Sequence, residues 1–396
     1  MLGLVLEGGG VKGAYHAGAI EALFEMGYTF DGVVGTSIGA LNGAMLVQGD
    51  WERCMEIWDT ITVSQIMDID DNALEKLNSF KIDRSLVSYL GSKIRSLGAM
   101  RDASSEKMRN FIESNIDEDK IRKSKMDFGL VTFSVNGLQP FELLKEDIPV
   151  GKFAEYLIAS ANYPVYKLHA IDGYNFIDGG IWDNMPIKLL IKKNYEDFVV
   201  IRTRDRFQSR YEQKYENYNI KYIIPSEKLG TAMNFTQNKI QYYKKLGYFD
   251  AVRTMKNLMG KQYTIDHFND NDMTEFMMDL PGELFKEALF ERKMEIPAAK
   301  DEAVARFLSL IKEENNLSDD DDLARTMVVF LEKFARIYGI DKFKVYDMQD
   351  FVSAIYLAAR EDVFDHKGKL QKASVKDADK ELFSTMVKYY FIKHPV

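Results

Sequence analysis

The segment Gly35-Thr36-Ser37-Ile38-Gly39 constrains the fold most, because it places a serine at a sharp turn between an expected strand and an expected helix. A short β-branched stretch precedes it, and the apolar residues 40–47 that follow are typical of a buried helix. A G-x-S-x-G motif in this context is the pattern of a nucleophile elbow, in which glycines leave room for the turn. Ser37 would then lie at a helix N-terminus, where backbone N–H groups favour negative charge.

Strand and helix patterns alternate on both sides of this turn. Expected strands cover residues 2–6, 31–36, 128–135 and 198–202, and expected helices cover residues 11–25 and 38–47. Such alternation predicts an α/β domain with a mainly parallel central sheet. Residues 74–119 look helical and polar, which suggests a cap or outer layer, and the tyrosine-rich stretch 211–222 is expected to be a solvated excursion.

The character of the sequence changes near residue 281. Apolar residues then recur at helical spacing in the segments 303–311, 323–338, 348–359 and 382–392, with no convincing strand between them. We therefore expect two domains, an α/β domain over residues 1–280 and an all-α region over residues 281–396. The acidic run Asp319–Asp322 is expected to start a helix at Leu323; it lacks the spacing of a calcium-binding loop.

Composition excludes several classes of protein. The chain of 396 residues carries 52 basic and 61 acidic residues, a formal net charge of −9, which argues against a nucleic-acid partner. The single cysteine, Cys54, is expected to be a small buried residue. The N-terminus lacks the basic region of a signal peptide, and no run approaches the roughly 18 apolar residues that span a bilayer. We expect a soluble, cytoplasmic protein.

A glycine-rich loop, Gly8 to Gly13, separates the first strand from the first helix. It matches the G-x-G-x-x-G pattern of dinucleotide-binding proteins, and Asp31 follows at about the distance of a ribose-binding acid. However, Asp31 precedes the second strand, whereas the ribose acid follows it. Three consecutive glycines suit a loop whose backbone N–H groups all face one oxyanion. A plain tight turn is the third interpretation.

Asp178 ends a short apolar strand and is followed by Gly179 and Gly180, which clear space around it. Taken alone, this segment could be a simple Asp-Gly turn. Together with the glycine loop and the serine turn, in this order, it resembles the motifs of the patatin-like phospholipase family. The resemblance covers roughly the first 205 residues and says little about the helical tail.

The resemblance implies a three-layer patatin-like fold and a Ser–Asp dyad. Ser37 would be the nucleophile, Asp178 the general base, and Gly8, Gly9 and Gly10 the oxyanion-binding loop. The residues that complete the motifs are Lys12, Gly13, Gly35, Gly39, Gly179 and Gly180. Lys12 could fix the glycine loop or meet a lipid phosphate, or it could be an exposed cation.

The expected function is hydrolysis of acyl esters of phospholipids or related lipids through an acyl-enzyme, without a metal or cofactor. Peripheral contact with a membrane is possible, and the sequence does not set the oligomeric state. Two other classes remain open: a dinucleotide-binding oxidoreductase and a non-catalytic scaffold. A Ser-Asp-His triad would need His267, His366 or His394, which we expect to be ordinary surface or packing residues, whereas His16 is expected on a helix surface.

Overall fold

The structure is a computed structural model, and its parts are two compact units, Met1–Met255 and Lys256–Val396. It describes residues 1–66, 98–163, 166–205, 214–266, 277–278, 280–318, 322–363 and residue 382. The boundary expected at residue 280 therefore lies inside the second unit. That residues 1–280 form the hydrolase domain stays a prediction.

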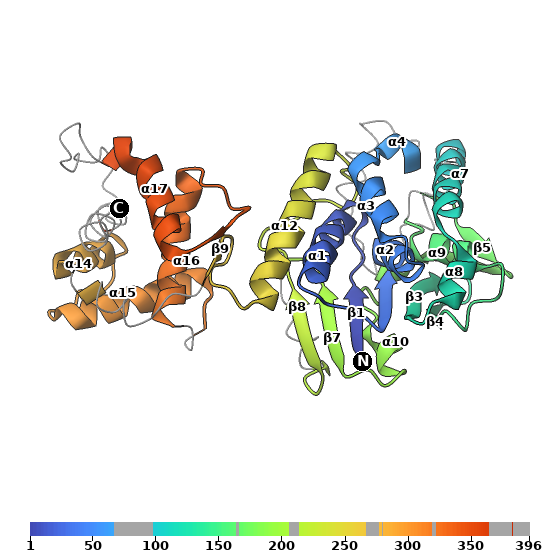
Figure 1. Ribbon diagram of the computed structural model, residues 1–396, viewed down its shortest axis with the longest axis horizontal. Coiled ribbons are helices and arrows are strands. Elements are labelled where there is room, and N and C mark those ends of the chain that lie inside the picture. The colour runs from blue at the N-terminus through green and yellow to red at the C-terminus, as the bar shows by residue number, and fades with distance from the viewer. Residues whose placement is uncertain are drawn as a thin grey trace. The chain divides into compact units, whose positions relative to one another are not determined.

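The first unit is built on an eight-stranded sheet (Figure 1). The strand order is β5-β6-β3-β2-β1-β7-β8, and β4 pairs with β3. The strands are β1 (Leu2–Leu6), β2 (Gly32–Thr36), β3 (Asp127–Ser134), β4 (Gln139–Leu144), β5 (His169–Ile171), β6 (Tyr174–Asp178), β7 (Asp197–Ile201) and β8 (Asn219–Ile223). Strands β3, β2, β1, β7 and β8 run parallel, while β4, β5 and β6 are antiparallel to their neighbours. The predicted mainly parallel sheet is confirmed.

Helices cover both faces of this sheet. On one face, α10 (Ile187–Ile191) packs Leu189 and Leu190 against β-branched residues such as Val34 and Val131. The helices α1 (Gly13–Glu25), α2 (Ile38–Val47), α9 (Phe153–Ser160) and α12 (Gln237–Met255) cover the other face (Figure 1). The result is the three-layer α/β arrangement that the sequence predicts.

One expectation about this unit is wrong. The tyrosine-rich stretch 211–222 is not a solvated excursion throughout, because Tyr215 is 4% exposed and residues 219–223 form β8 alongside β7. Exposed and more buried residues alternate in this edge strand, which is a strand pattern, but the charges and tyrosines before it led to the expectation of a solvated segment. Of the expected cap at residues 74–119, the helices α7 (Gly98–Asn115) and α8 (Glu118–Lys123) are described, and residues 74–97 lie outside the described residues. The helices α3 (Trp51–Thr60) and α4 (Val63–Ile66) precede them.

The second unit is mainly helical, as predicted. Its helices are α14 (Gly282–Glu291), α15 (Lys300–Asn315), α16 (Leu323–Ile337) and α17 (Met348–Val363). Asp322 caps α16 by accepting a hydrogen bond from the Arg325 N–H group. The expectation of no strand fails, because β9 (Thr264–Ile265) and β10 (Val345–Tyr346) form a short parallel pair. The expected helix at 382–392 lies outside the described residues apart from Leu382.

The longest described helix, α12, has 19 residues and contains lysines, an aspartate and an arginine. Within the described ranges, no helix has both the length and the apolar character needed to cross a membrane.

Candidate active site

Ser37 occupies a strained turn between β2 and α2. Its φ of 57° and ψ of −126° lie in a region that residues with a side chain rarely adopt. The flanking glycines make the turn possible: a Cβ on Gly35 would lie 2.4 Å from the carbonyl carbon of Gly39, and a Cβ on Gly39 would lie 2.2 Å from the Leu6 carbonyl oxygen. The spacing of the motif therefore follows from how closely β1, β2 and α2 meet.

A serine from another helix fixes the same turn. The Ser37 N–H group donates to Ser160 Oγ at 3.0 Å, and Ser160 Oγ donates to the Val131 carbonyl oxygen at 2.7 Å. Ser160 thus ties the elbow to both α9 and β3. No local sequence pattern predicts this contact, because 123 positions separate Ser37 from Ser160.

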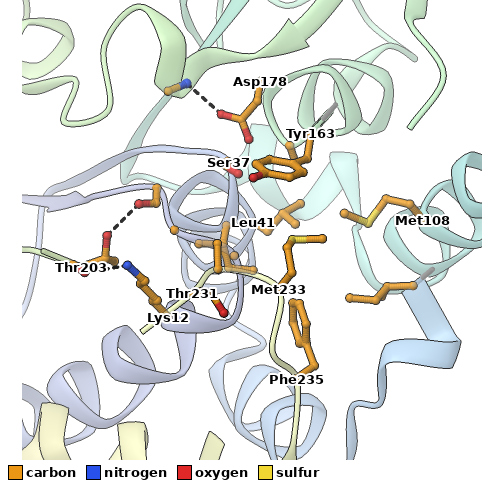
Figure 2. A pocket seen from close by; sticks show the side chains of 18 of the residues that line it. Lys12, Ser37, Leu41, Met108, Tyr163, Asp178, Thr203, Thr231, Met233 and Phe235 are labelled. Carbon is orange, nitrogen blue, oxygen red and sulfur yellow. Dashed lines mark hydrogen bonds between the residues drawn. The ribbon is translucent and has the colours of Figure 1, made fainter. Parts of the chain in front are cut away.

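Asp178 ends β6 and is 6% exposed. Its Oδ1 accepts the Gly180 N–H group at 2.8 Å, and Ser37 lines the same pocket as Asp178 (Figure 2). Burial raises the pKa of Asp178 to about 6, although the nearby Ser37 hydroxyl and the Gly180 N–H group act in the opposite direction. A carboxylate with a pKa in this range is a stronger base than an ordinary aspartate and remains mostly ionised at neutral pH.

The glycine loop is held at Gly8. The Gly8 N–H group donates to the Asn184 carbonyl oxygen at 3.3 Å, while the Gly8 carbonyl oxygen accepts Asn184 Nδ2 at 3.1 Å and Thr203 Oγ1 at 2.8 Å. By contrast, the N–H groups of Gly9 and Gly10 have no hydrogen-bond acceptor among the residues that the structure describes. Of the three expected oxyanion donors, Gly8 is therefore already engaged.

A buried ion pair lies behind the loop. Glu7, at the end of β1, accepts the Thr203 N–H group at 2.7 Å and Arg202 Nε at 3.3 Å, and both side chains of the pair are almost fully buried. Sequence reasoning missed these residues, because 195 residues separate Glu7 from Arg202. The only available signal was a charged residue at the end of each of two apolar strands.

Lys12 lies in the wall of the site and is not a free surface cation. Its Nζ donates to the Thr203 carbonyl oxygen at 3.4 Å. Burial, followed by the nearby Arg204 charge, lowers the pKa of Lys12, whereas Glu7 opposes this shift. The interpretation of Lys12 as an exposed cation is wrong.

These groups line one pocket of about 330 Å³ (Figure 2). Ser37, Asp178, Gly180, Lys12 and the three loop glycines 8–10 all contribute to its wall. The motif residues Gly13, Gly35, Gly39 and Gly179 lie behind the wall, in close contact with neighbouring elements. Most of the remaining lining is apolar: Leu41, Ile61, Ile66, Met108, Phe111, Met233 and Phe235. The pocket thus has a polar end near Lys12 and Thr203 and an apolar end across from it (Figure 2).

The described histidines do not join Ser37. His16 is fully buried in α1, not on a helix surface, and burial lowers its pKa to about 3. His169 lines a different pocket, and burial lowers its pKa to about 4. His267, His366 and His394 lie outside the described residues. Tyr163 does line the pocket beside Ser37 (Figure 2), and burial, followed by the Asp178 charge, raises its pKa to about 12.

The geometry speaks against a dinucleotide site. Asp31 precedes β2 and accepts the Leu2 N–H group at 2.7 Å, so it lies at the opposite end of the strands from the glycine loop.

Cys54 is buried, as predicted, and its burial raises the thiol pKa to about 12. Within the part of the chain that the structure describes, no group of three His, Cys, Asp or Glu residues could hold a metal ion.

Comparison with known proteins identifies the class. Residues 4–191 match the family model described as patatin-like phospholipase. This part of the chain is therefore a patatin-like phospholipase domain, and it contains the serine turn, the glycine loop and Asp178.

Curated proteins that match this chain share a short stretch with it. A Caenorhabditis elegans protein named for a patatin-like phospholipase domain and the neuropathy target esterase sws of Drosophila persimilis are each 54% identical over 44 residues. That stretch is 11% of this chain, and it spans only 4% and 3% of the two relatives.

Two solved structures are similar at low identity. VipD from Legionella pneumophila is 16% identical with a TM-score of 0.42, over 98% of this chain and 89% of that one. ExoU from Pseudomonas aeruginosa, solved in complex with SpcU, is 15% identical with a TM-score of 0.33, over 99% and 78% of the two chains.

Proposed function

We propose that this protein is a serine acyl hydrolase that cleaves acyl esters of phospholipids or related lipids. The observation that carries the proposal is the position of Ser37 and the buried Asp178 carboxylate in the wall of one pocket that also holds the glycine loop (Figure 2). A serine hydroxyl is a weak nucleophile unless a neighbouring base takes its proton. The match of residues 4–191 to the patatin-like phospholipase family model supports the same class of reaction.

The first half of the reaction forms an acyl-enzyme. Ser37 Oγ attacks the ester carbonyl carbon as its proton passes to Asp178. The carbonyl oxygen of the tetrahedral intermediate gains a negative charge, and the N–H groups of Gly9 and Gly10, which have no acceptor among the described residues, are the donors to stabilise it. Asp178 then gives the proton to the leaving alkoxide, so the alcohol departs and the acyl group stays on Ser37.

The second half repeats these steps with water. Asp178 takes a proton from a water molecule, the resulting hydroxide attacks the acyl carbonyl carbon, and the proton returns to Ser37 as the carboxylic acid leaves. The raised pKa of Asp178 fits both directions of proton transfer, since a base near neutrality can accept and return a proton at comparable cost. Ser160 and the Glu7–Arg202 pair act only by positioning the elbow and the loop.

The test is turnover of p-nitrophenyl butyrate and of a phosphatidylcholine by the wild type, Ser37→Ala and Asp178→Asn. Matched controls make the same changes at exposed positions: Ser114→Ala on α7 and Asp172→Asn in the β5–β6 turn. We expect both site variants to lose turnover by at least about 10³-fold while both controls keep it. Normal turnover by a folded Asp178→Asn variant would refute the dyad and favour a histidine base.

A fluorophosphonate probe distinguishes an enzyme from a scaffold. We expect one covalent adduct on Ser37, located by mass spectrometry of the labelled peptide, and none in Ser37→Ala. No adduct and no turnover by the wild type would leave the scaffold as the better description. Lipid substrate, peripheral membrane contact and a cytoplasmic location are parts of this proposal; vesicle flotation and cell fractionation check the last two.

A further inference from the structure

A second pocket of about 360 Å³ lies next to the pocket of Ser37. Apolar side chains such as Ile158 and Leu168 contribute to its lining, together with six polar or charged residues: Ser105, Glu106, Arg109, Asn162, Lys167 and His169. Three residues line both pockets: Met108, Ala161 and Tyr166. The two spaces are therefore separated by a wall that is one side chain thick.

Met108 is the removable part of that wall. Ala161 has almost no side chain to remove, and the Tyr166 hydroxyl donates to the Ile66 carbonyl oxygen at 3.4 Å, which fixes it. Met108 has an unbranched apolar side chain on α7, and it points into the apolar end of the Ser37 pocket, toward Leu41 and Met233 (Figure 2). Methionine side chains are flexible and fill irregular gaps, so this part of the wall can be trimmed without breaking a hydrogen bond.

The direction of an acyl chain follows from the two ends of the pocket. Lys12, Thr203 and the glycine loop occupy the polar end, and the apolar side chains lie across the cavity (Figure 2). An acyl chain attached to Ser37 loses the least free energy when it extends along the apolar side. Leu41, one helical turn after Ser37 on α2, lies at the start of that path, and Met108 lies farther along it.

We propose that the Met108 side chain sets the maximum length of the acyl chain that the Ser37 pocket accepts, and that the second pocket receives the end of a longer chain when Met108 is shortened. This proposal rests on the function proposed above. It names a specificity-determining residue and assigns the second pocket an acyl ligand.

The experiment measures kcat/KM for p-nitrophenyl esters from acetate to palmitate with the full chain. For Met108→Ala we expect the preferred length to shift by several carbons, with a gain of about fourfold for each further methylene that becomes buried. For Met108→Trp we expect the opposite shift, toward short esters. The matched control is Met233→Ala, which removes the same side chain from the Ser37 pocket at a position that does not line the second pocket. An identical length profile for Met108→Ala and Met233→Ala would overturn the proposal.

A binding measurement separates this proposal from the hydrolase activity. Saturated fatty acids of increasing length are added to Ser37→Ala with and without Met108→Ala, and the rise in Tm is recorded. We expect the longest fatty acid that still raises Tm to be several carbons longer in the double variant. Absence of turnover together with this shift would refute only the hydrolase, whereas turnover without any shift in length would refute only the role of Met108.

Discussion

Two regions of the molecule present consecutive backbone N–H groups, and they use them in opposite ways. In the second unit, the N–H groups of Lys261, Gln262 and Tyr263 all donate to Oε1 of Glu332, at 2.7 to 2.9 Å. In the first unit, the N–H groups of Gly9 and Gly10 have no acceptor among the described residues. The first set of N–H groups is bound by a side chain of the folded chain, whereas the second lines the Ser37 pocket, where we propose that it binds the oxyanion of the reaction.

Two buried carboxylates, Glu332 and Asp178, also differ in the number of backbone N–H groups that they accept. Glu332, 3% exposed, accepts three backbone N–H groups, whereas Asp178, 6% exposed, accepts one. Burial raises the pKa of Asp178 because it disfavours the charged form, and a single backbone donor offsets only part of this effect. The two sites thus combine similar burial with a different number of backbone donors.

Among the changes that test this comparison, the largest effect is expected in the loop of Gly9 and Gly10, whose N–H groups have no acceptor among the described residues. Gly10 has a φ of +61°, and a Cβ there would lie 2.2 Å from the Ala232 carbonyl oxygen, so Gly10→Ala must move the loop. We expect a loss of about 10²–10³-fold in kcat for ester hydrolysis, which is typical of a lost oxyanion donor. The control is Gly27→Ala, at a φ of +84° with nothing within 4 Å. Equal turnover by the two folded variants would show that the loop donates nothing to the reaction.

The next prediction concerns Glu332, whose carboxylate accepts three backbone N–H groups. Glu332→Ala leaves three backbone N–H groups without their acceptor, so we expect the free energy of unfolding of the second unit to fall by about 3–5 kcal/mol. Glu332→Gln retains an acceptor oxygen and should cost less. Urea denaturation measures both, with the exposed Glu287→Ala on α14 as the control, expected within about 0.5 kcal/mol of the wild type. An unchanged free energy of unfolding in Glu332→Ala would show that the three hydrogen bonds to Glu332 do not stabilise the second unit.

Replacing Asp178 should have the opposite effect on stability: it should raise the free energy of unfolding at pH 7. Its pKa is about 6 in the folded protein and 3.8 as an ordinary aspartate, so between these values the folded state holds a proton that the unfolded state lacks. Stability therefore falls as pH rises from about 4 to about 6, and at pH 7 the ionised carboxylate costs up to about 3 kcal/mol. Asp178→Asn should then be more stable than the wild type by about 1–3 kcal/mol at pH 7. A less stable variant at pH 7 would contradict this reasoning; denaturation at pH 4 and pH 7 provides the measurement.

The smallest expected effect concerns how kcat/KM of the wild type depends on pH. If Asp178 is the base, only its ionised form is active, so kcat/KM should be constant above about pH 7 and fall tenfold per unit well below pH 6. The profile is measured with an ester whose own hydrolysis is pH-independent in this range. A profile that stays flat down to pH 4.5 would show that the base has an ordinary aspartate pKa.

Much of the first unit could be predicted from the sequence, because its signals are local. The helix at Ile38–Val47 and the strand at Leu2–Leu6 have the predicted bounds, and Asp178 does end a strand. Each is defined by apolar periodicity and by glycines within a few residues. Strand β8 was missed because its alternating pattern covers only five residues and follows a stretch rich in tyrosine and charge.

The three turns could be predicted from local sequence: a serine between close glycines, a glycine loop, and an aspartate before two glycines. The local sequence could not predict that Ser37 and Asp178 share one pocket, that Asn184 binds Gly8 while Gly9 and Gly10 have no acceptor among the described residues, or that burial raises the pKa of Asp178. A turn is set by the sterics of neighbouring residues, whereas these contacts join residues more than 100 positions apart, which only the packed sheet brings together.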